Sequence, residues 1–195
     1  MNYVRSANLD LSWLPRHRLD IADLDRMVAA GILREDDRVE LIDGELIVMA
    51  PQGQEHSGII LDLTTMLVRA AGDRAVVSCQ LPVRLDSFNQ PEPDFALLRP
   101  PVTRYRIRRA LPEDILVAIE IAASSLRYDR EVKRQLYAVY GIAEYWVIDV
   151  HGKTVEVCRL PEGDRYTSVT LARSGETIEP QALPGLRLSV SDIVG

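Results

Sequence analysis

The stretch LVAIEIAASSLRYDREVKRQLYAVYGIAEYWVIDV, residues 116–150, carries the pattern that decides the fold class. Its opening, residues 116–121, is apolar apart from Glu120, which is typical of a central strand buried on both faces. Residues 128–140 then show helical spacing, and residues 144–150 form a second apolar run of strand length. The stretch therefore predicts a strand, a helix and a strand in succession.

The helix predicted at 128–140 has a recognisable apolar side. Val132, Leu136 and Val139 recur at helical spacing, so we expect them to face the interior of the protein. Gly141 is expected to end the helix, because glycine readily adopts the backbone conformation found just after a helix C-terminus.

The segments before this stretch alternate between helices and strands. RVELIDGELIVMA, residues 38–50, contains two β-rich runs separated by Asp43-Gly44, which is the strongest short hairpin signal. An amphipathic helix is expected between a capping Asp20 and Gly31. A second helix is expected over residues 55–71, and short strands near residues 76–79, 83–85 and 94–98.

After residue 150 the chain returns to β-structure. TVEVCRL, residues 154–160, is expected to pair with the strand at 144–150 through a His151-Gly152 turn. The remainder is expected to form short strands and turns that end in LRLSVSDIV. Together these elements predict an α/β (α+β) fold in which helices flank a mixed β-sheet, with an N-terminal hairpin and extra C-terminal strands. We expect residues 1–19 to be an N-terminal extension and residues 20–195 to form a single domain.

Composition and charge narrow the class of protein. The chain has 195 residues, 47% hydrophobic and 27% charged, which indicates a packed domain and excludes a disordered chain. The first residues show no secretory or transit signal, and no apolar run is long enough to cross a membrane, so we expect a cytoplasmic protein. A net charge of −6 argues mildly against a non-specific coat on nucleic acid.

Cysteine and histidine give no pattern of a metal centre. Cys79 and Cys158 lack the spacing of a disulfide framework or a zinc knuckle, and His17, His56 and His151 are dispersed along the chain. Any metal ion bound by this chain is therefore expected to have oxygen ligands.

Glu120 is physically unusual, because an unpaired ionised carboxylate in a buried strand is costly. Asp94 begins the strand in PEPDFALL, residues 91–98, and could bring a second carboxylate to it if the two strands are neighbours. Lys133, on the following helix, could approach this pair, with Asp129 and Tyr137 on the same helical face. Two carboxylates, a Mg²⁺ ion and a lysine suffice to hydrolyse a phosphodiester.

The ordered set of motifs resembles a known family. ELIDGELIVMAP (40–51), His56 at a helix start, PEPDFALL (91–98), the run from 117 to 149 and PGLRLSVSDIV (184–194) are together similar to the Uma-type putative restriction endonucleases. That family belongs to the PD-(D/E)XK nuclease superfamily, and the resemblance spans most of residues 20–195.

The resemblance implies a restriction-endonuclease-like fold and a set of site residues. It implies that Asp94 and Glu120 are catalytic metal ligands and that Glu40 is an additional acidic residue near the metal. Lys133 would be a catalytic lysine displaced to the helix from its usual place two residues after the glutamate, which here holds Ala122.

Ala123 is a second departure, since relatives often carry an aspartate there. Loss of that carboxylate could change the affinity for a metal ion.

The activity implied by the resemblance is that of a magnesium- or manganese-dependent endonuclease that hydrolyses DNA. Because cutting both strands of a duplex takes two active sites, we also expect a homodimer. The alternative is a catalytically weak or inactive nuclease-fold module that binds nucleic acid or a protein partner in a mobile-element or defence system.

Simpler interpretations of the same acidic residues stay open. Glu120 could form a buried salt bridge with Arg127 or Lys133 without any metal, and Glu40 could be an ordinary hairpin charge. His56 is interpreted as a helix-start residue.

The aromatic and basic groups of the chain also have two interpretations each. A tyrosine and tryptophan set could stack on nucleotides, but we assign it to packing: Tyr137, Tyr140, Tyr145 and Trp146. The one basic cluster could contact phosphates or lie in a solvated loop: Arg104, Arg106, Arg108 and Arg109.

Overall fold

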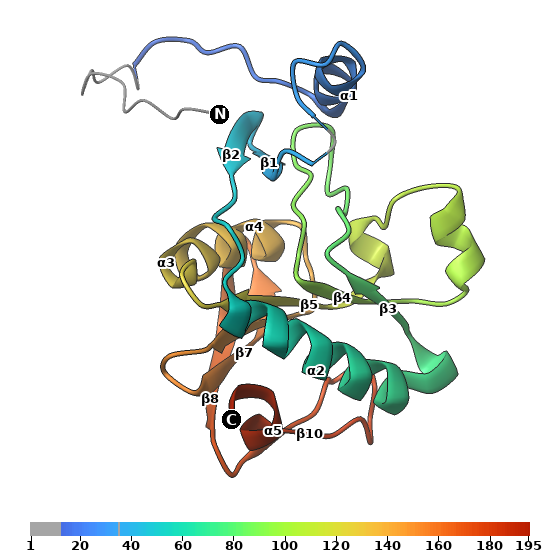
Figure 1. The fold of residues 1–195 in the computed structure, drawn as a ribbon, viewed down its shortest axis with the longest axis vertical. Coiled ribbons are helices and arrows are strands. Elements are labelled where there is room, and N and C mark those ends of the chain that lie inside the picture. The colour runs from blue at the N-terminus through green and yellow to red at the C-terminus, as the bar shows by residue number, and fades with distance from the viewer. Residues whose placement is uncertain (1–12, 35) are drawn as a thin grey trace.

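A six-stranded sheet runs through the computed structural model, which describes residues 13–34 and 36–195 (Figure 1). Strands β5 and β6 are parallel and all other neighbours are antiparallel, so the predicted mixed sheet is confirmed. In sheet order the strands are β3 (Val76–Cys79), β4 (Phe95–Leu98), β5 (Ile115–Ala122), β6 (Glu144–Asp149), β7 (Thr154–Glu162) and β8 (Arg165–Arg173). Residues 1–12 of the expected N-terminal extension lie outside the described residues.

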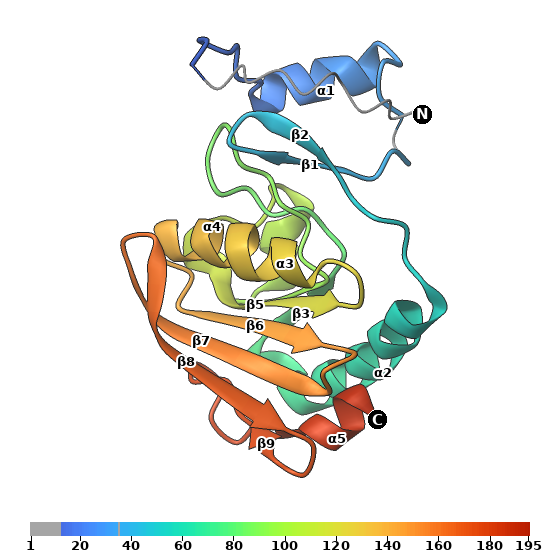
Figure 2. The same cartoon turned by 90° about the vertical axis from the view of Figure 1, so that its left-hand side faces the viewer.

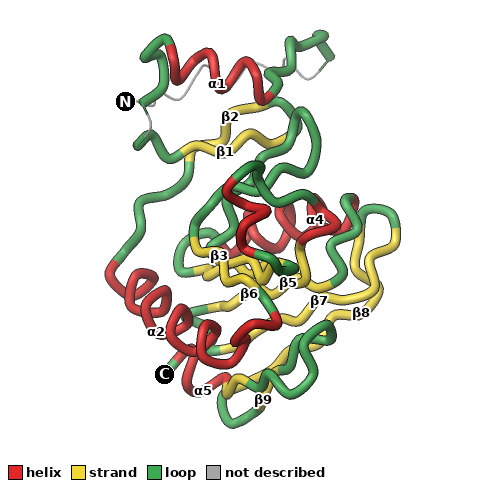
Figure 3. The backbone as a smooth tube through the Cα atoms, turned by 90° about the vertical axis from the view of Figure 1, so that its right-hand side faces the viewer, coloured by secondary structure: helices red, strands yellow, loops and turns green. Residues whose placement is uncertain are grey.

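Helices cover both faces of the sheet (Figure 2). On one face lie α2 (Gln54–Ala71) and α5 (Val190–Val194), which contact each other (Figure 3). The other face is covered by α3 (Leu126–Tyr128) and α4 (Arg134–Val139). The flanking helices predicted for the fold class are therefore present.

Side chains of β5 alternate between the two helical layers, as the pleat of a strand requires. Ile119 and Ile121 pack in the core on the α2 side, whereas Ala118 and Ala122 pack in the core on the α4 side. Glu120 lies between these alanines in the alternation and so faces the α4 side. Burial of β5 on both faces, predicted from its apolar sequence, is confirmed.

The connection from β5 to β6 is a helix interrupted by a π-helical turn, η4 (Asp129–Lys133), between α3 and α4. The inward face predicted for this helix is confirmed for Leu136, which is partly buried against the core, and wrong for the two valines. Val132 and Val139 are 39% and 55% exposed. The side chains buried in their place are those of Asp129, Lys133, Tyr137 and Ala138. The polar face turns inward because Glu120 of the sheet and Glu40 of the hairpin accept from Lys133, while Ser125 donates to Asp129.

The predicted hairpin is confirmed as β1 (Val39–Ile42) paired with β2 (Glu45–Val48). Asp43 and Gly44 have φ of 51° and 76°, and two positive values are what a two-residue hairpin turn needs. The hairpin lies above the main sheet (Figure 1), and a bridge between Leu41 and Gln90 ties it to the loop before β4.

A small apolar cluster joins the hairpin to α1 (Ile21–Ala29). The side chains of Ile21, Leu24, Leu33 and Leu41 form it. Asp20 caps α1 as predicted. The Asp20 side chain accepts from the backbone N of Asp23, and the Asp23 side chain accepts from the backbone N of Asp20.

One predicted strand is wrong. Residues 83–85 form no strand, and the backbone N of Val83 instead donates to the carbonyl of Pro91 at 2.9 Å. Prolines at 82, 91 and 93 lack the N–H groups that a ladder there would need.

In LRLSVSDIV only β10 (Leu188–Ser189) is extended, pairing with β9 (Thr177–Ile178). The rest becomes α5, because the Ser189 side chain accepts from the backbone N of Asp192 and so caps a helix.

The longest helix, α2, has 18 residues and an amphipathic pattern. Its inner face carries Ile59, Leu63 and Leu67, and its outer face meets water. Among the residues that the structure describes, no helix combines the length and the apolar character needed to cross a membrane.

The inner face of α2 should carry much of the stability of the fold. Replacing Leu63, which is 0% exposed, by Ala should lower the free energy of unfolding by about 2–5 kcal/mol, since it leaves a cavity against the sheet. Leu61 lies two residues earlier, on the opposite side of α2, and is 71% exposed. It is the matched control, and Leu61→Ala should change stability little. Urea unfolding followed by fluorescence measures both, and equal losses would contradict the assigned inner face.

Candidate active site

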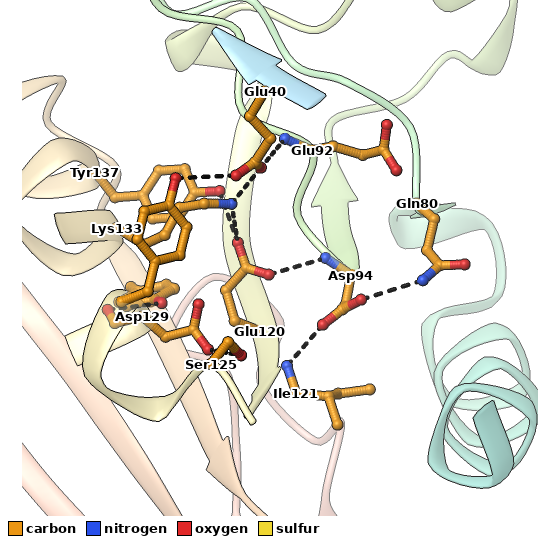
Figure 4. Close-up of polar contacts among 12 residues, drawn as sticks. Glu40, Gln80, Glu92, Asp94, Glu120, Ile121, Ser125, Asp129, Lys133 and Tyr137 are labelled. Carbon is orange, nitrogen blue, oxygen red and sulfur yellow. Dashed lines mark hydrogen bonds and ion pairs between the residues drawn. The ribbon is translucent and has the colours of Figure 1, made fainter. Parts of the chain in front are cut away.

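Asp94 and Glu120 meet where β4 begins alongside β5. Asp94 directly precedes β4, which pairs antiparallel with β5 so that Phe95 lies opposite Ile119. The backbone N of Asp94 donates to Oε2 of Glu120 at 3.2 Å, and the backbone N of Ile121 donates to Oδ2 of Asp94 at 2.8 Å. The structure thus brings together the two carboxylates that the sequence placed on separate strands (Figure 4).

Lys133 reaches this pair from η4. Its Nζ donates to Oε1 of Glu120 at 2.9 Å and to Oε1 of Glu40 at 2.5 Å (Figure 4). The position of Lys133 on the helix therefore places the ammonium beside the glutamate, while Ala122 stands two residues after it. The pairing of Glu120 with Lys133, anticipated as a metal-free interpretation, is present in the structure, whereas Arg127 instead pairs with exposed Glu131.

Glu40 comes to the site from β1 and is held there by several donors. Besides Lys133, the backbone N of Glu92 donates to its Oε1 at 2.6 Å and the hydroxyl of Tyr128 donates to its Oε2 at 3.0 Å. Glu40 is buried, so it is more than an ordinary hairpin charge: it neutralises the ammonium and connects the hairpin to the helix.

Two further residues contact Asp94 that the sequence did not single out as site residues. His56, in the first turn of α2, has Nε2 at 3.1 Å from Oδ2 of Asp94. Gln80, just after β3, donates through Nε2 to Oδ1 of Asp94 at 3.2 Å. Both contacts join segments far apart in the chain, and only the place of His56 at a helix start hinted at one of them.

A cavity of about 350 Å³ is lined by Glu40, His56, Asp94, Glu120 and Lys133. One part of its wall is polar and includes Asp94, Glu120 and Lys133. Another part is the end of β2 and the turn after it, residues 47–53. Ala123, Ser124 and Ser125, the positions of the sequence departure and its neighbours, also line the cavity.

Burial shifts the pKa values of the ionisable groups in this cluster. Loss of water raises the pKa of the Glu120 carboxyl well above its usual range, although the Lys133 ammonium partly opposes this shift. Burial also disfavours the charged form of Lys133, yet the carboxylates of Glu120 and Glu40 outweigh it and raise the pKa of the ammonium. Desolvation likewise raises the pKa of the Tyr137 hydroxyl, which donates to Oε1 of Glu120 at 3.1 Å.

The donor set suits a hard divalent cation. Four carboxylates are buried around a single buried ammonium, that of Lys133, and the acids are Glu40, Asp94, Glu120 and Asp129. Oδ1 of Asp94 and Oε2 of Glu120 each accept one hydrogen bond within the described residues, which leaves lone pairs for a cation. In residues 13–34 and 36–195 no three acidic, histidine or cysteine side chains are arranged to hold a metal ion as they stand.

The arginine cluster between β4 and β5 does not line this cavity. Arg104 and Arg108 bind the buried carboxylate of Asp114, with Nη1 to oxygen distances of 2.8 and 2.5 Å. Those two arginines therefore neutralise an internal charge. Of the set predicted as possible phosphate contacts, Arg106 and Arg109 form no salt bridge within the described residues.

Comparisons with known proteins agree with this architecture. Residues 21–191 match the sequence model of the Uma2 family, described as a putative restriction endonuclease. Among solved structures, a putative nuclease belonging to DUF820 from Anabaena variabilis ATCC 29413 superimposes with a TM-score of 0.64 and 22% identity, covering 85% of this chain and 94% of that one. No match was found among curated proteins.

Removing the Lys133 ammonium should destabilise the fold, because the buried acids would lose their counter-charge. Lys133→Met should lower the free energy of unfolding by about 3–5 kcal/mol, because Glu40 and Glu120 lose their only buried cation. Adding Glu120→Gln to that variant should recover part of the loss, since one uncompensated carboxylate disappears. Urea unfolding of the single and double variants measures the coupling, and a fully additive double variant would contradict it.

Asp129 should make stability depend on pH. Burial raises the pKa of its carboxyl to about 6, against the hydrogen bond from Ser125 Oγ that lowers it. Because the pKa of Asp129 is higher in the folded state than in the unfolded state, its protonated form stabilises the fold. This contribution is fully present below the unfolded-state pKa of 3.8 and is lost as pH rises through about 6. Relative to Asp129→Asn, the wild type should therefore lose up to about 3 kcal/mol between pH 4 and pH 7. A difference independent of pH in unfolding experiments would contradict this assignment.

Proposed function

Because the chain belongs to the Uma2 family of putative restriction endonucleases, we propose that it is a magnesium-dependent endonuclease that hydrolyses phosphodiester bonds in DNA. In this reaction water adds across one P–O ester bond, leaving a phosphate monoester on one fragment and a hydroxyl group on the other. The observation that carries the proposal is the meeting of Asp94, Glu120 and Lys133 at one cavity.

Asp94 and Glu120 are the residues that would hold the metal ion. When bound, Mg²⁺ or Mn²⁺ supplies Lewis acidity toward the phosphate and a water nucleophile at neutral pH. The chain itself fixes the direction of both carboxylates. Ile121 N–H, His56 and Gln80 orient Asp94, while Asp94 N–H and Tyr137 orient Glu120.

Lys133 would stabilise the negative charge that develops on the phosphate during hydrolysis. Its Nζ is already placed by Glu120 and Glu40, so little reorganisation is needed when a phosphate arrives. Glu40 would position the ammonium and would also be a further acidic residue near the metal.

Ala123 marks the point at which activity could be weakened. It lines the cavity without a carboxylate, beside Ser124 and Ser125, so metal affinity would rest on the remaining acids. For cleavage of both strands of a duplex two such sites are needed, and for that reaction a symmetric dimer is part of the proposal.

Substitution of the three central residues should abolish cleavage. Asp94→Asn, Glu120→Gln and Lys133→Met should each slow Mg²⁺-dependent cleavage of a labelled DNA by at least about 100-fold, because each removes a group that acts on the phosphate or on the metal. Gel analysis of the products over time measures the rate. Calorimetric titration with Mg²⁺ should show weaker binding by Glu120→Gln.

Glu131→Gln is the matched control, since Glu131 lies on the same helical turn as Lys133 and its side chain is 60% exposed. It should cleave like the wild type. If the wild type and the three site variants give the same background, the protein is the inactive nuclease-fold module that the sequence left as the alternative.

A further inference from the structure

The cavity has a second wall that the hydrolytic chemistry does not use. This wall consists of apolar residues at the end of β2 and in the turn after it: Ile47, Val48, Met49, Ala50 and Pro51. Unlike core side chains, these residues remain partly or fully accessible to water. A flat, apolar nucleobase fits such a surface, and it would lie beside the polar groups that act on a phosphate.

The polar groups are buried residues that line this cavity. The side chains of Asp94, Glu120 and Lys133 lie in residues that are at most 9% exposed. A volume of about 350 Å³ is at the small end of the range for ligand pockets, which suits one nucleotide. A base that is stacked and paired within a duplex would first have to leave the helix to enter, whereas a base in an unpaired strand is free to do so.

The charges around the cavity also disfavour a duplex. Within the described part of the chain, Arg38 and Lys133 are the cationic residues of the lining, and Lys133 is engaged by Glu40 and Glu120. Binding of duplex DNA draws most of its affinity from many phosphate contacts along a basic surface. A short flexible strand held by one arginine and by its base needs fewer such contacts.

We propose that the cavity is a nucleotide pocket which takes one nucleotide from an unpaired DNA strand. The base lies against the wall formed by residues 47–51, and the adjoining phosphate lies at Asp94, Glu120 and Lys133. This inference rests on the proposed nuclease function and specifies its substrate. Because one unpaired strand needs one cut, this reaction can be carried out by a single copy of the chain.

The test compares one DNA sequence in three forms: a single strand, a blunt duplex and a duplex with an unpaired tail. Each is labelled and incubated with the full chain and Mg²⁺ or Mn²⁺. We expect the single strand and the tail to be cut at least about tenfold faster than the paired region, since pairing and stacking must otherwise be broken. Fluorescence anisotropy with the Glu120→Gln variant gives binding without cleavage and should show the same order.

Met49→Ala tests the wall. It should raise the KM for the single strand about tenfold and leave kcat largely unchanged, because it removes contact with the base without touching the reacting groups. Leu61→Ala, a loss of a similar side chain on the outer face of α2, is the matched control and should leave both constants unchanged.

The outcomes separate this inference from the function on which it rests. A duplex cut and bound as well as the single strand would overturn the nucleotide pocket and leave the nuclease intact. Met49→Ala behaving like Leu61→Ala would overturn the assignment of the wall. If no form is cut and none is bound, the nuclease function and the pocket both fail.

Discussion

The ionised carboxylate of Glu120 cannot lie in the middle of β5 without partners, and most of the architecture near the site follows from that constraint. Lys133 supplies the opposite charge, while Tyr137 and the backbone N–H of Asp94 supply hydrogen bonds. The ammonium is itself buried and needs a second acid, which comes from Glu40 on the hairpin. Two adjacent ion pairs thus join the sheet, the helix between β5 and β6, and the N-terminal hairpin. The hairpin shares only a small apolar cluster with α1, so its placement over the sheet depends on polar contacts.

The acidic centre could be anticipated because its signals are local. One carboxylate interrupts the apolar run of β5 and another stands where the polar lead-in to β4 gives way to apolar residues, so both could be recognised without a structure. The hairpin at Asp43-Gly44 was equally clear, because a two-residue turn with positive φ restricts the residues that can occupy it. Whether Asp94, Glu120, Lys133 and Glu40 perform catalysis stays a prediction, whereas their proximity is a fact of the structure.

The rest could not be anticipated, for physical reasons that differ between residues. In the helix between β5 and β6, the inward positions of Val132 and Val139 were assigned wrongly. Hydrophobic periodicity assumes that charged side chains seek water, whereas here Asp129 and Lys133 are buried. His56 and Gln80 were missed because their contacts with Asp94 span 38 and 14 residues of sequence and depend on how α2 and β3 pack. The strand expected at 83–85 failed because the prolines facing it have no N–H to donate.

The π-helical turn at Asp129–Lys133 has a consequence for how this site can vary. Such a turn accommodates one more residue than an α-helical turn. Deleting one residue within it would restore a regular helix and leave the ammonium facing the acids, because the wide turn had absorbed that residue. Each residue of an α-helix turns the chain by about 100°, so a residue lost between the turn and Tyr137 would instead swing the Tyr137 hydroxyl away from Glu120. Homologous chains can therefore differ by one residue at this turn and keep the same polar face.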